Sequence, residues 1–498
     1  MSKPILVLLA GLLLVGCTGT LQVGIERTST PDVAPAATIA ALSADNSRLA
    51  TQVASQVTPT PAPLTMGRLA YVQGGDIWVK TLPSGVSLRL TTDGHNMDPH
   101  WSPSGEWLAF RKDRQVIVEQ EAPCENQKLR SQLCMESTTV VQRQVWVIEA
   151  NATGVHPLYE GASVDAFAWS PADDRLAYLA APVGLSIINA DGTGLVTVVS
   201  QAPADRTSPG RVGRFAWNPD GTSLAYEWRT QALEQSSPYQ GLWKVSTDGK
   251  TLVELYDSGF PNKGEVTLAG WSPLGKRVLF WQSQVPYAPL TDGAPLYAVN
   301  TDRDQPKGAA VRLGAEESVL SYSDFIAPAP RGARPEVRDA VALVVGASRS
   351  TWRNKRIELA GRDLSSQGLA AVSPAWSPDG ALLAFSAMPD RADLGSGESA
   401  RQELMQRRIW TTNVAGEPRP QRITNSPVYR DERPLWSADG SHILFARLDA
   451  RGRASVWIMA ADGSSSRQVV DELTPAPDPV LSYGHVDWDA WFDWWRGM

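Results

Sequence analysis

The stretch "PAWSPDGALLAF", from Pro374 to Phe385, occurs six times in this chain with small changes. In each copy a short strand ends at the aromatic residue, and "SPDG" follows as a tight turn. Pro fixes φ at the second turn position, and Gly accepts the positive φ that a tight hairpin asks of its last turn residue. The apolar residues "LLAF" then return as an antiparallel strand. The other copies begin at Pro99, Phe167, Phe215, Ala269 and Pro434.

A second motif follows the first in each unit. It is a strand rich in β-branched and aromatic residues that ends in an Asp, Gly or Asn turn, as in "SVWIMAADG" from Ser455. A weaker fourth strand comes next, for example Pro420 to Thr424. Four antiparallel strands per unit, repeated radially, form a β-propeller blade. The second motif begins at Asp76, Gln144, Leu185, Gly241, Pro295, Lys355, Arg408 and Ser455.

The number of blades follows from the spacing of the copies. The interval between Trp271 and Trp376 is twice the usual one, which predicts a degenerate copy in "YSDFIAPAPRGA" with Phe325 in the place of Trp. With this copy included, the sequence contains seven first strands but eight second motifs. The tail "GHVDWDAWFDWW", from Gly484 to Trp495, has no partner of its own and is predicted to supply the missing first strand. We expect an all-β propeller of eight four-stranded blades, closed by this C-terminal strand; seven blades is the alternative.

The repeated Trp residues are expected to pack between neighbouring sheets, because burying one ring removes about 150–250 Å² of surface from water. In the tail, we expect Trp488 and Trp491 to be buried in the closing blade. Trp494 or Trp495 is expected to cap that blade or to be exposed.

The repeat carries a family resemblance. "AWSPDGALLAF" followed by a strand of the type "IW" and a Gly turn resembles the TolB-type, WD-repeat-like β-propeller family, from Gly67 to Met498. The resemblance implies the fold and says little about activity, because one fold hosts many unrelated functions.

The N-terminus has the pattern of a targeting segment. Lys3 precedes the apolar run "PILVLLAGLLLVG", which is shorter than the ~20 residues that a membrane-spanning helix needs. The residues "LVGC", Leu14 to Cys17, resemble the lipobox of bacterial lipoproteins. That resemblance implies cleavage before Cys17 and a lipid on its thiol. An ordinary secretory signal peptide is the alternative.

These patterns divide the chain into three parts. Residues 1–16 are predicted to be the lipoprotein signal peptide, 17–66 the lipidated Cys17 with a flexible tether rich in Thr, Ala, Pro and Ser, and 67–498 the propeller. The expected location is a bacterial cell membrane, lipid-anchored on the extracytoplasmic side.

Two further cysteines, Cys124 and Cys134, lie in the polar stretch "CENQKLRSQLC". Disulfides persist in exported proteins, and the two residues are close in sequence, so a local disulfide is predicted. Two free thiols are the alternative.

No catalytic motif is found. The net charge is -7 and no basic block is present, which argues against nucleic acid as a partner. His95 and His100, with Asp93 and Asp98 beside them, could form an acid/base or metal pair, but we favour loop residues flanking a strand. No catalytic residue, cofactor or metal is predicted.

The favoured function is therefore a membrane-anchored, monomeric scaffold that binds an envelope protein. The alternative is an envelope enzyme, a carbohydrate lyase or hydrolase, with its site at the central channel; His, Arg and carboxylate side chains converging there would favour it. Partners are expected on the side of the ring that carries the long second-to-third connections. These are Arg111 to Arg143, Glu227 to Gln240, Gln282 to Ala294, and Ala387 to Arg407.

Overall fold

The computed structural model describes residues 66–123, 133–161, 163–201, 210–230, 239–260, 263–283, 293–302, 309–318, 323–346, 350–395, 398–475 and 484–497. The chain divides into two compact units, Met1–Leu64 and Thr65–Met498, and every described residue belongs to the second. The signal peptide, Cys17 and the tether lie outside the described residues and stay predictions. No helix in the described ranges is both long and apolar enough to cross a bilayer.

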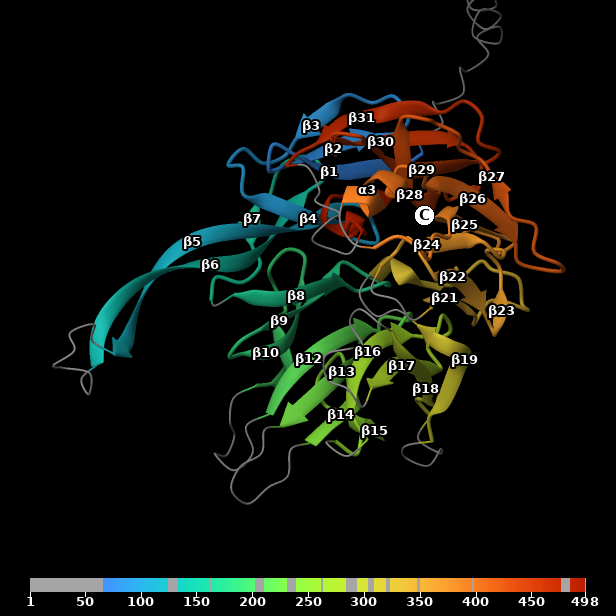
Figure 1. The fold of residues 1–498 in the computed structure, drawn as a ribbon. Helices are drawn as coiled ribbons and strands as arrows, with labels where there is room; N and C mark the ends of the chain where they lie inside the picture. The colour runs from blue at the N-terminus through green and yellow to red at the C-terminus, as the bar shows by residue number, and fades with distance from the viewer. Residues whose placement is uncertain are drawn as a thin grey trace, which may run out of the picture. The chain divides into compact units, whose positions relative to one another are not determined.

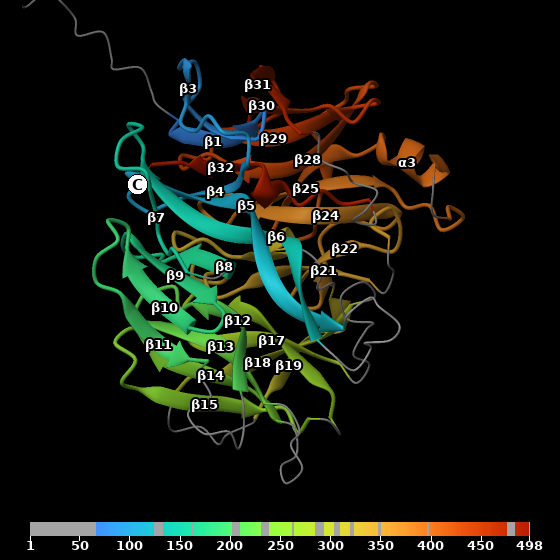
Figure 2. The same ribbon diagram turned by 90° about the vertical axis from the view of Figure 1, so that its left-hand side faces the viewer.

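The second unit is a propeller of eight blades, each with four antiparallel strands, as predicted (Figure 1; Figure 2). The first strands of neighbouring blades contact one another, so the first strand of each blade is the innermost. Blades 1 to 3 are β4 (Asn96–Trp101), β5 (Trp107–Pro123), β6 (Leu133–Glu149), β7 (His156–Pro157); β8 (Val164–Trp169), β9 (Arg175–Ala180), β10 (Gly184–Asn189), β11 (Val196–Ser200); and β12 (Gly210–Trp217), β13 (Ser223–Thr230), β14 (Tyr239–Ser246), β15 (Leu252–Asp257).

The other blades follow in chain order. Blades 4 to 7 are β16 (Glu265–Trp271), β17 (Arg277–Ser283), β18 (Ala294–Asn300), β19 (Val311–Ser318); β20 (Ile326–Pro328), β21 (Val341–Val345), β22 (Arg356–Leu359), β23 (Arg362–Asp363); β24 (Leu369–Trp376), β25 (Leu382–Pro389), β26 (Arg408–Asn413), β27 (Gln421–Arg422); and β28 (Tyr429–Trp436), β29 (His442–Asp449), β30 (Ala454–Ala460), β31 (Arg467–Leu473). Blades 4 and 5 also share one bridge, between Ser318 and Val345.

Blade 8 joins the two ends of the unit. Its innermost strand is β32 (Phe492–Trp495), and β1 (Arg68–Gln73), β2 (Asp76–Thr81) and β3 (Ser87–Arg89) follow outward. β32 pairs antiparallel with β1, with Trp494 opposite Leu69. The prediction that the C-terminal tail supplies the missing first strand is confirmed.

Apolar clusters fill the spaces between neighbouring sheets. One contains residues of β9, β10, β12 and β13, with Trp217 buried among them, and another joins β29 and β30 to the closing blade. The first-strand Trp residues are buried, except Trp169, which is half-buried. The third-strand Trp residues are half-buried and pack against these clusters.

The first-strand Trp residues also link successive blades by hydrogen bonds. Except in Trp101, the Nε1–H of the first-strand Trp donates to a backbone carbonyl oxygen of the preceding blade. The accepting residue is the one just before the equivalent strand-end position in that blade. Trp217 donates to Ala168 at 3.0 Å, and Trp436 donates to Ala375 at 3.1 Å. Trp169 and Trp271 make the same bond.

This bond corrects one sequence assignment. Trp376 donates to the carbonyl of Ala327 at 2.8 Å, so Pro328 occupies the Trp position of blade 5. Phe325 was expected there. It lies instead in the short 3-10 helix η2 (Ser323–Phe325) and is fully buried. The physical reason is register: "APRGA" after Pro328 aligns with "SPDGA" after Trp376, whereas an alignment on the aromatic residue does not.

The tail also differs in detail from expectation. Trp488 is buried as predicted, in the 3-10 helix η3 (Trp488–Ala490). Trp494 takes the repeat position and is buried, whereas Trp491 and Trp495 are half-buried. Four Trp residues lie close together in the tail, so the sequence alone did not show which of them takes the repeat position in β32.

Candidate functional site

The connection between Arg111 and Arg143 was expected to be a loop, and that expectation is wrong for most of it. The two strands β5 and β6 continue far beyond the blade in unbroken register, from Trp107 opposite Glu149 to Pro123 opposite Leu133. The innermost strand β4 stops pairing at Lys112. We call residues 113–123 and 133–143 the arm; it is the long cyan hairpin that extends past the other strands in Figure 1.

Runs of β-branched residues on both strands explain why the arm is a hairpin. Val116 is opposite Val140, and Ile117 is opposite Thr139. Such cross-strand pairs are the unit of sheet stability. The base of the arm is fixed by the Asp113 N–H, which donates to the carbonyl of His95 at 3.0 Å.

The arm exposes apolar side chains. Ile117 is 74% exposed, Met135 is 61% exposed and Val141 is 55% exposed. Cross-strand register places Ile117 and Thr139 on one face, and Val141 lies two residues along the same strand from Thr139, so all three share that face. Apolar side chains gathered on a projecting element mark an interaction surface.

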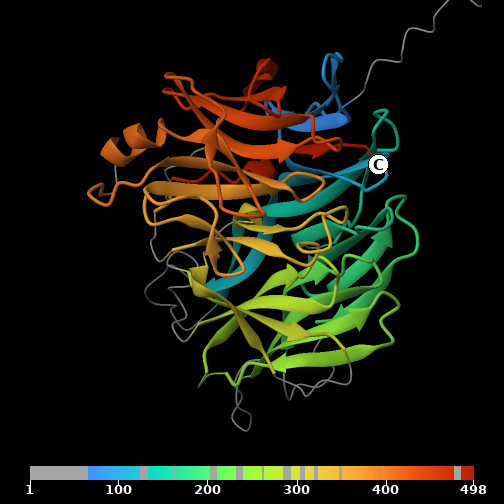
Figure 3. The ribbon, with the colours of Figure 1, turned by 90° about the vertical axis from the view of Figure 1, so that its right-hand side faces the viewer.

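The other long connections lie on the same side of the ring by topology, because each joins a second strand to a third. The ranges 231–238 and 284–292 lie outside the described residues. The connection between β25 and β26 contains helix α3 (Glu398–Leu404), shown in orange in Figure 3. Its residues Ala400 and Leu404 pack with Trp352 and Met388, so this connection is anchored to the ring.

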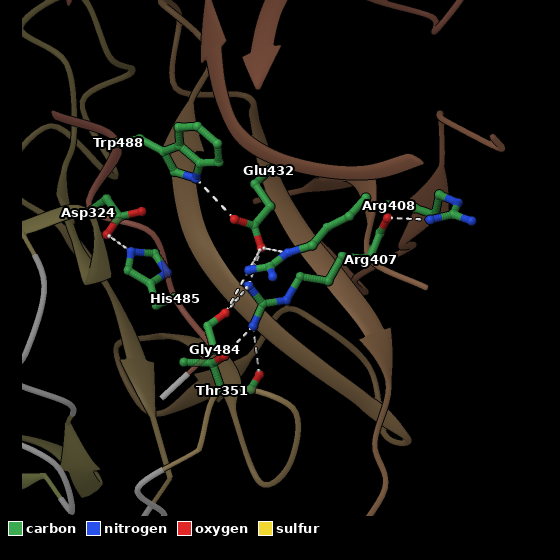
Figure 4. Close-up of polar contacts among 9 residues, drawn as sticks. Asp324, Thr351, Arg407, Arg408, Glu432, Gly484, His485 and Trp488 are labelled. Carbon is green, nitrogen blue, oxygen red and sulfur yellow. Dashed lines mark hydrogen bonds and ion pairs between the residues drawn. The ribbon is translucent and has the colours of Figure 1, made fainter. Parts of the chain in front are cut away.

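A buried ionic cluster holds the C-terminal segment where it enters the ring (Figure 4). We call Arg407, Arg430 and Glu432, with the Gly484 carbonyl, the latch. Arg430 donates to Glu432 Oε1 at 2.5 Å through Nε and to the Gly484 carbonyl at 2.6 Å through Nη2. Arg407 donates to Glu432 and, at 3.3 Å, to the Gly484 carbonyl. Trp488 Nε1 donates to Glu432 Oε2 at 3.0 Å.

The electrostatics of the latch follow from burial and pairing. Burial alone would raise the pKa of Glu432, but the guanidinium groups of Arg430 and Arg407 lower it to about 2. Burial lowers the pKa of Arg430 to about 10. Glu432 and Arg430 are therefore both charged at neutral pH. Beside the latch, His485 Nε2 lies 3.0 Å from Asp324 Oδ1.

A second group of charges lies on the innermost strands of blades 1, 7 and 8 and on η3, which precedes the strand of blade 8. We call Asp98, His100, Arg433, Asp489 and Asp493 the central cluster. His100 Nε2 lies 3.0 Å from Asp98 Oδ1, and Arg433 forms an ion pair with Asp489. Burial alone would lower the pKa of His100, but the Asp98, Asp493 and Asp489 carboxylates raise it to about 9. His100 is therefore an imidazolium at neutral pH.

Local backbone geometry positions this cluster. The innermost strands of blades 1, 6 and 7 each contain a β-bulge three residues before the repeat Trp. Asp98, Ser373 and Arg433 occupy the bulges with φ of 60°, 54° and 51°. Residues other than Gly rarely adopt this conformation, and such bulges re-aim side chains at functional sites.

The structure separates the residues that the sequence grouped. His100 pairs with Asp98, whereas His95 is exposed and Asp93 pairs with Lys112. Cys124 lies outside the described residues, and only the backbone of Cys134 is described, in β6, so the disulfide stays a prediction. Among the described residues, no group of three or more His, Cys, Asp or Glu side chains could hold a metal ion.

Sequence reasoning missed the latch. A signal was present in "YRDERPLW", where Arg430 to Arg433 place four consecutive charges in an innermost strand that should be buried. Lys, Arg, Asp and Glu are almost never buried unless paired. Their partners could not be identified, because Arg407 and Gly484 come from other blades.

Comparison with known proteins adds the fold alone. No family model and no curated protein matches this chain. Among solved structures, Porphyromonas gingivalis dipeptidyl peptidase 4 is 11% identical, with a TM-score of 0.52 over 83% of this chain and 60% of its own. TolB from Acinetobacter baumannii is 10% identical, with a TM-score of 0.34 over 86% of this chain and 69% of its own. An oligogalacturonate lyase from Vibrio parahaemolyticus is 11% identical, with a TM-score of 0.39 over 81% of this chain and 86% of its own. The chain thus spans 60% of the length of the peptidase, and at this identity the likeness shows the fold alone.

Proposed function

We propose that this protein is a lipoprotein anchored through Cys17 on the extracytoplasmic side of a bacterial membrane, and that its propeller is a protein-binding scaffold. The arm carries this proposal. It projects from a rigid ring and exposes Ile117, Met135 and Val141 to solvent. Elements that project from a rigid scaffold commonly carry binding residues, and a pre-formed hairpin loses less entropy on binding than a flexible loop does.

Arm substitutions test the binding role. Ile117→Ser and Val141→Ser keep the strand pairing and remove the exposed apolar surface, so we expect each to reduce the recovery of partner proteins from detergent-solubilised membranes. Val86→Ser is the matched control, because Val86 is 93% exposed on the turn between β2 and β3, on the opposite side of the ring. Replacing Lys112 to Gln142 by a Gly/Ser turn should abolish capture while the melting temperature of the ring is kept. Unchanged capture by this deletion variant would contradict the proposal.

The membrane anchor has its own test. Each buried CH₂ of an acyl chain contributes ~0.8 kcal/mol, and one chain alone binds only marginally, so the several chains of a lipoprotein hold firmly. Cys17→Ser should therefore move the protein from the membrane pellet to the soluble fraction. A variant that stays in the pellet after a carbonate wash would show that another element anchors the chain.

One observation favours the enzyme alternative, a carbohydrate lyase or hydrolase. Charged side chains do converge at the centre of the ring, as the central cluster. The arrangement favours structure over catalysis, because His100 and Arg433 are each paired with a carboxylate. Turnover of polyuronate or neutral glycans by the wild type, lost in Asp98→Asn and His100→Gln, would establish the enzyme. No turnover by the purified protein would leave the scaffold as the function.

A further inference from the structure

The arm has an outer edge that the ring does not cover. β7 pairs with β6 only at Trp146 and Val147, so between Met135 and Gln144 no described strand lies along the edge of β6 that faces away from β5. A two-stranded hairpin is at best marginally stable by itself in water. An exposed strand edge is a template for another strand unless charge, Pro or a bulge blocks it.

The sequence leaves this edge unblocked. The run "STTVVQ", from Ser137 to Gln142, contains no charge and no Pro, and four of its residues are β-branched. The register from Trp107 to Pro123 contains no bulge. The opposite strand of the arm differs, because Asp113, Arg114 and Glu119 place charges along β5.

Backbone direction shows which groups face outward. The Val145 carbonyl accepts a hydrogen bond from Leu158 N–H at 2.9 Å, on the side of β7, and the Arg143 N–H donates to Ser163 Oγ at 3.0 Å on the same side. Backbone groups alternate in direction along a strand. Val141, Thr139 and Ser137 therefore present their N–H and C=O groups to the open edge.

These three residues are symmetric about Thr139. We propose that β6 of one molecule pairs antiparallel with β6 of a second copy, around a two-fold axis at Thr139. This pairing places Thr139 opposite Thr139 of the partner subunit, and Ser137 opposite Val141 of the partner subunit. The three outward residues of each copy then exchange about six hydrogen bonds. The two hairpins form one sheet of four strands, which is above the two-stranded size that is only marginally stable by itself.

Side chains support the same arrangement. Ile117 lies across the hairpin from Thr139 on the exposed face, so two-fold pairing gathers Ile117, Thr139 and Val141 of both copies into one apolar patch. The uncharged run of one copy meets the uncharged run of the other, and no like charges are brought together. An isologous contact of this kind closes on itself and does not propagate into a fibre.

The contact is smaller than the ~1,600 Å² of a standard stable interface, so the dimer is concentration-dependent in solution. Anchoring in one membrane raises the effective concentration of the two copies. The inference departs from the monomer expected from the sequence. It rests on the proposed function only in treating the arm as a binding surface.

Cysteine cross-linking tests the axis. Thr139→Cys, in the full chain purified in detergent, should form a disulfide-linked dimer on mild oxidation, because directly opposed Cβ atoms lie ~4.5–5.5 Å apart. Ile117→Cys is the matched control. It lies on the same face and is more exposed, but the two copies are three strand spacings apart, roughly 14 Å, which is beyond disulfide reach. Equal cross-linking of both variants, or of neither, would overturn the inference.

Sedimentation measures the association itself. Val141→Lys should weaken dimerisation by about tenfold, since each dimer carries the substitution twice at a charge-free edge. A wild type that stays monomeric at every concentration, or a Val141→Lys dimer as strong as the wild type, would also overturn it. Either result leaves the scaffold proposal standing, because that proposal fails only if the arm deletion still captures its partners.

Discussion

Glu432 is 1% exposed and accepts hydrogen bonds from Arg407, Arg430 and Trp488, which come from two neighbouring blades and from the C-terminal segment. One carboxylate thus compensates two buried guanidinium groups. For single residues, the sequence predicts which side chains are buried better than it predicts which residues they form hydrogen bonds with. The repeat identified the buried Trp positions, because these residues recur at the end of an innermost strand, directly before the same turn. Arg430 is two residues from Glu432, but Arg407 and Trp488 are 25 and 56 residues away, and no local pattern encodes such a separation.

Removing the charge of Glu432 should be costly. Glu432→Gln leaves Arg407 and Arg430 buried without a counter-charge, and loss of one member of a buried ion pair typically costs ~3–5 kcal/mol. Chemical denaturation should show a free energy of unfolding lower by about that amount. The matched control is Glu417→Gln, an exposed position, which should change it by less than about 0.5 kcal/mol. Equal stability of the two variants would mean that the latch is not formed.

His100 predicts a pH dependence of stability. Its pKa is raised from 6.5 to about 9 in the folded protein, so the folded state binds the proton more tightly than the unfolded state. The resulting stabilisation is complete below pH 6.5 and is lost as pH rises through 9. We expect the melting temperature to fall between pH 6.5 and 9, and to fall less in His100→Gln. His95→Gln, at an exposed position, should follow the wild type. Parallel curves for His100→Gln and the wild type would show that the Asp98 pair contributes nothing.

At the scale of the strand, the repeat predicted which segments form strands. It did not predict the length or the register of each strand. "SPDG" and the two strands around it are local, so the hairpins were predictable. The β-branched runs "VIV" and "TTVV" also favour strands in the arm, but the polar residues between them resemble a loop. In blade 5 an aromatic residue misled the alignment, because Pro328 preserves the strand end while it lacks the ring that marks the other copies.

The hydrogen bonds between blades give a test at this scale. Trp436 Nε1 donates to Ala375, whereas the buried Nε1 of Trp101 has no partner among the described residues. Trp→Phe keeps most of the ring and removes the N–H in both cases. Trp436→Phe leaves a carbonyl unsatisfied, so it should destabilise the protein by about 1 kcal/mol more than Trp101→Phe. The comparison uses the denaturant concentration at the midpoint of unfolding of each variant, provided that the slope of the unfolding free energy against denaturant is unchanged. A Trp101→Phe variant that is the less stable of the two would show that volume, rather than the hydrogen bond, dominates at these positions.

At the scale of the molecule, closure was predictable because the strands could be counted: eight second motifs require eight first strands, and one tail was left over. The latch was not predictable, because Arg407 of blade 6 and Arg430 of blade 7 bind the Gly484 carbonyl of that tail, 77 and 54 residues away. In a propeller whose two chain ends meet in one blade, the inner edge of β1 would be unpaired without a strand from the other end. β32 pairs with that edge of β1, and the latch holds the segment that leads into β32.

Deletion of residues 484–498 should therefore open the ring. It removes β32, the buried rings of Trp488 and Trp494, and the Gly484 carbonyl that accepts from the latch. One large-to-Ala core change costs ~3–5 kcal/mol, so the loss of two buried Trp residues together with a strand should lower the melting temperature well below that of the wild type. The matched control deletes only Gly497 and Met498, which follow β32, and should melt like the wild type. If the longer deletion also melts at the wild-type temperature, the blades hold together without β32, and the contacts between neighbouring sheets alone would account for the stability of the ring.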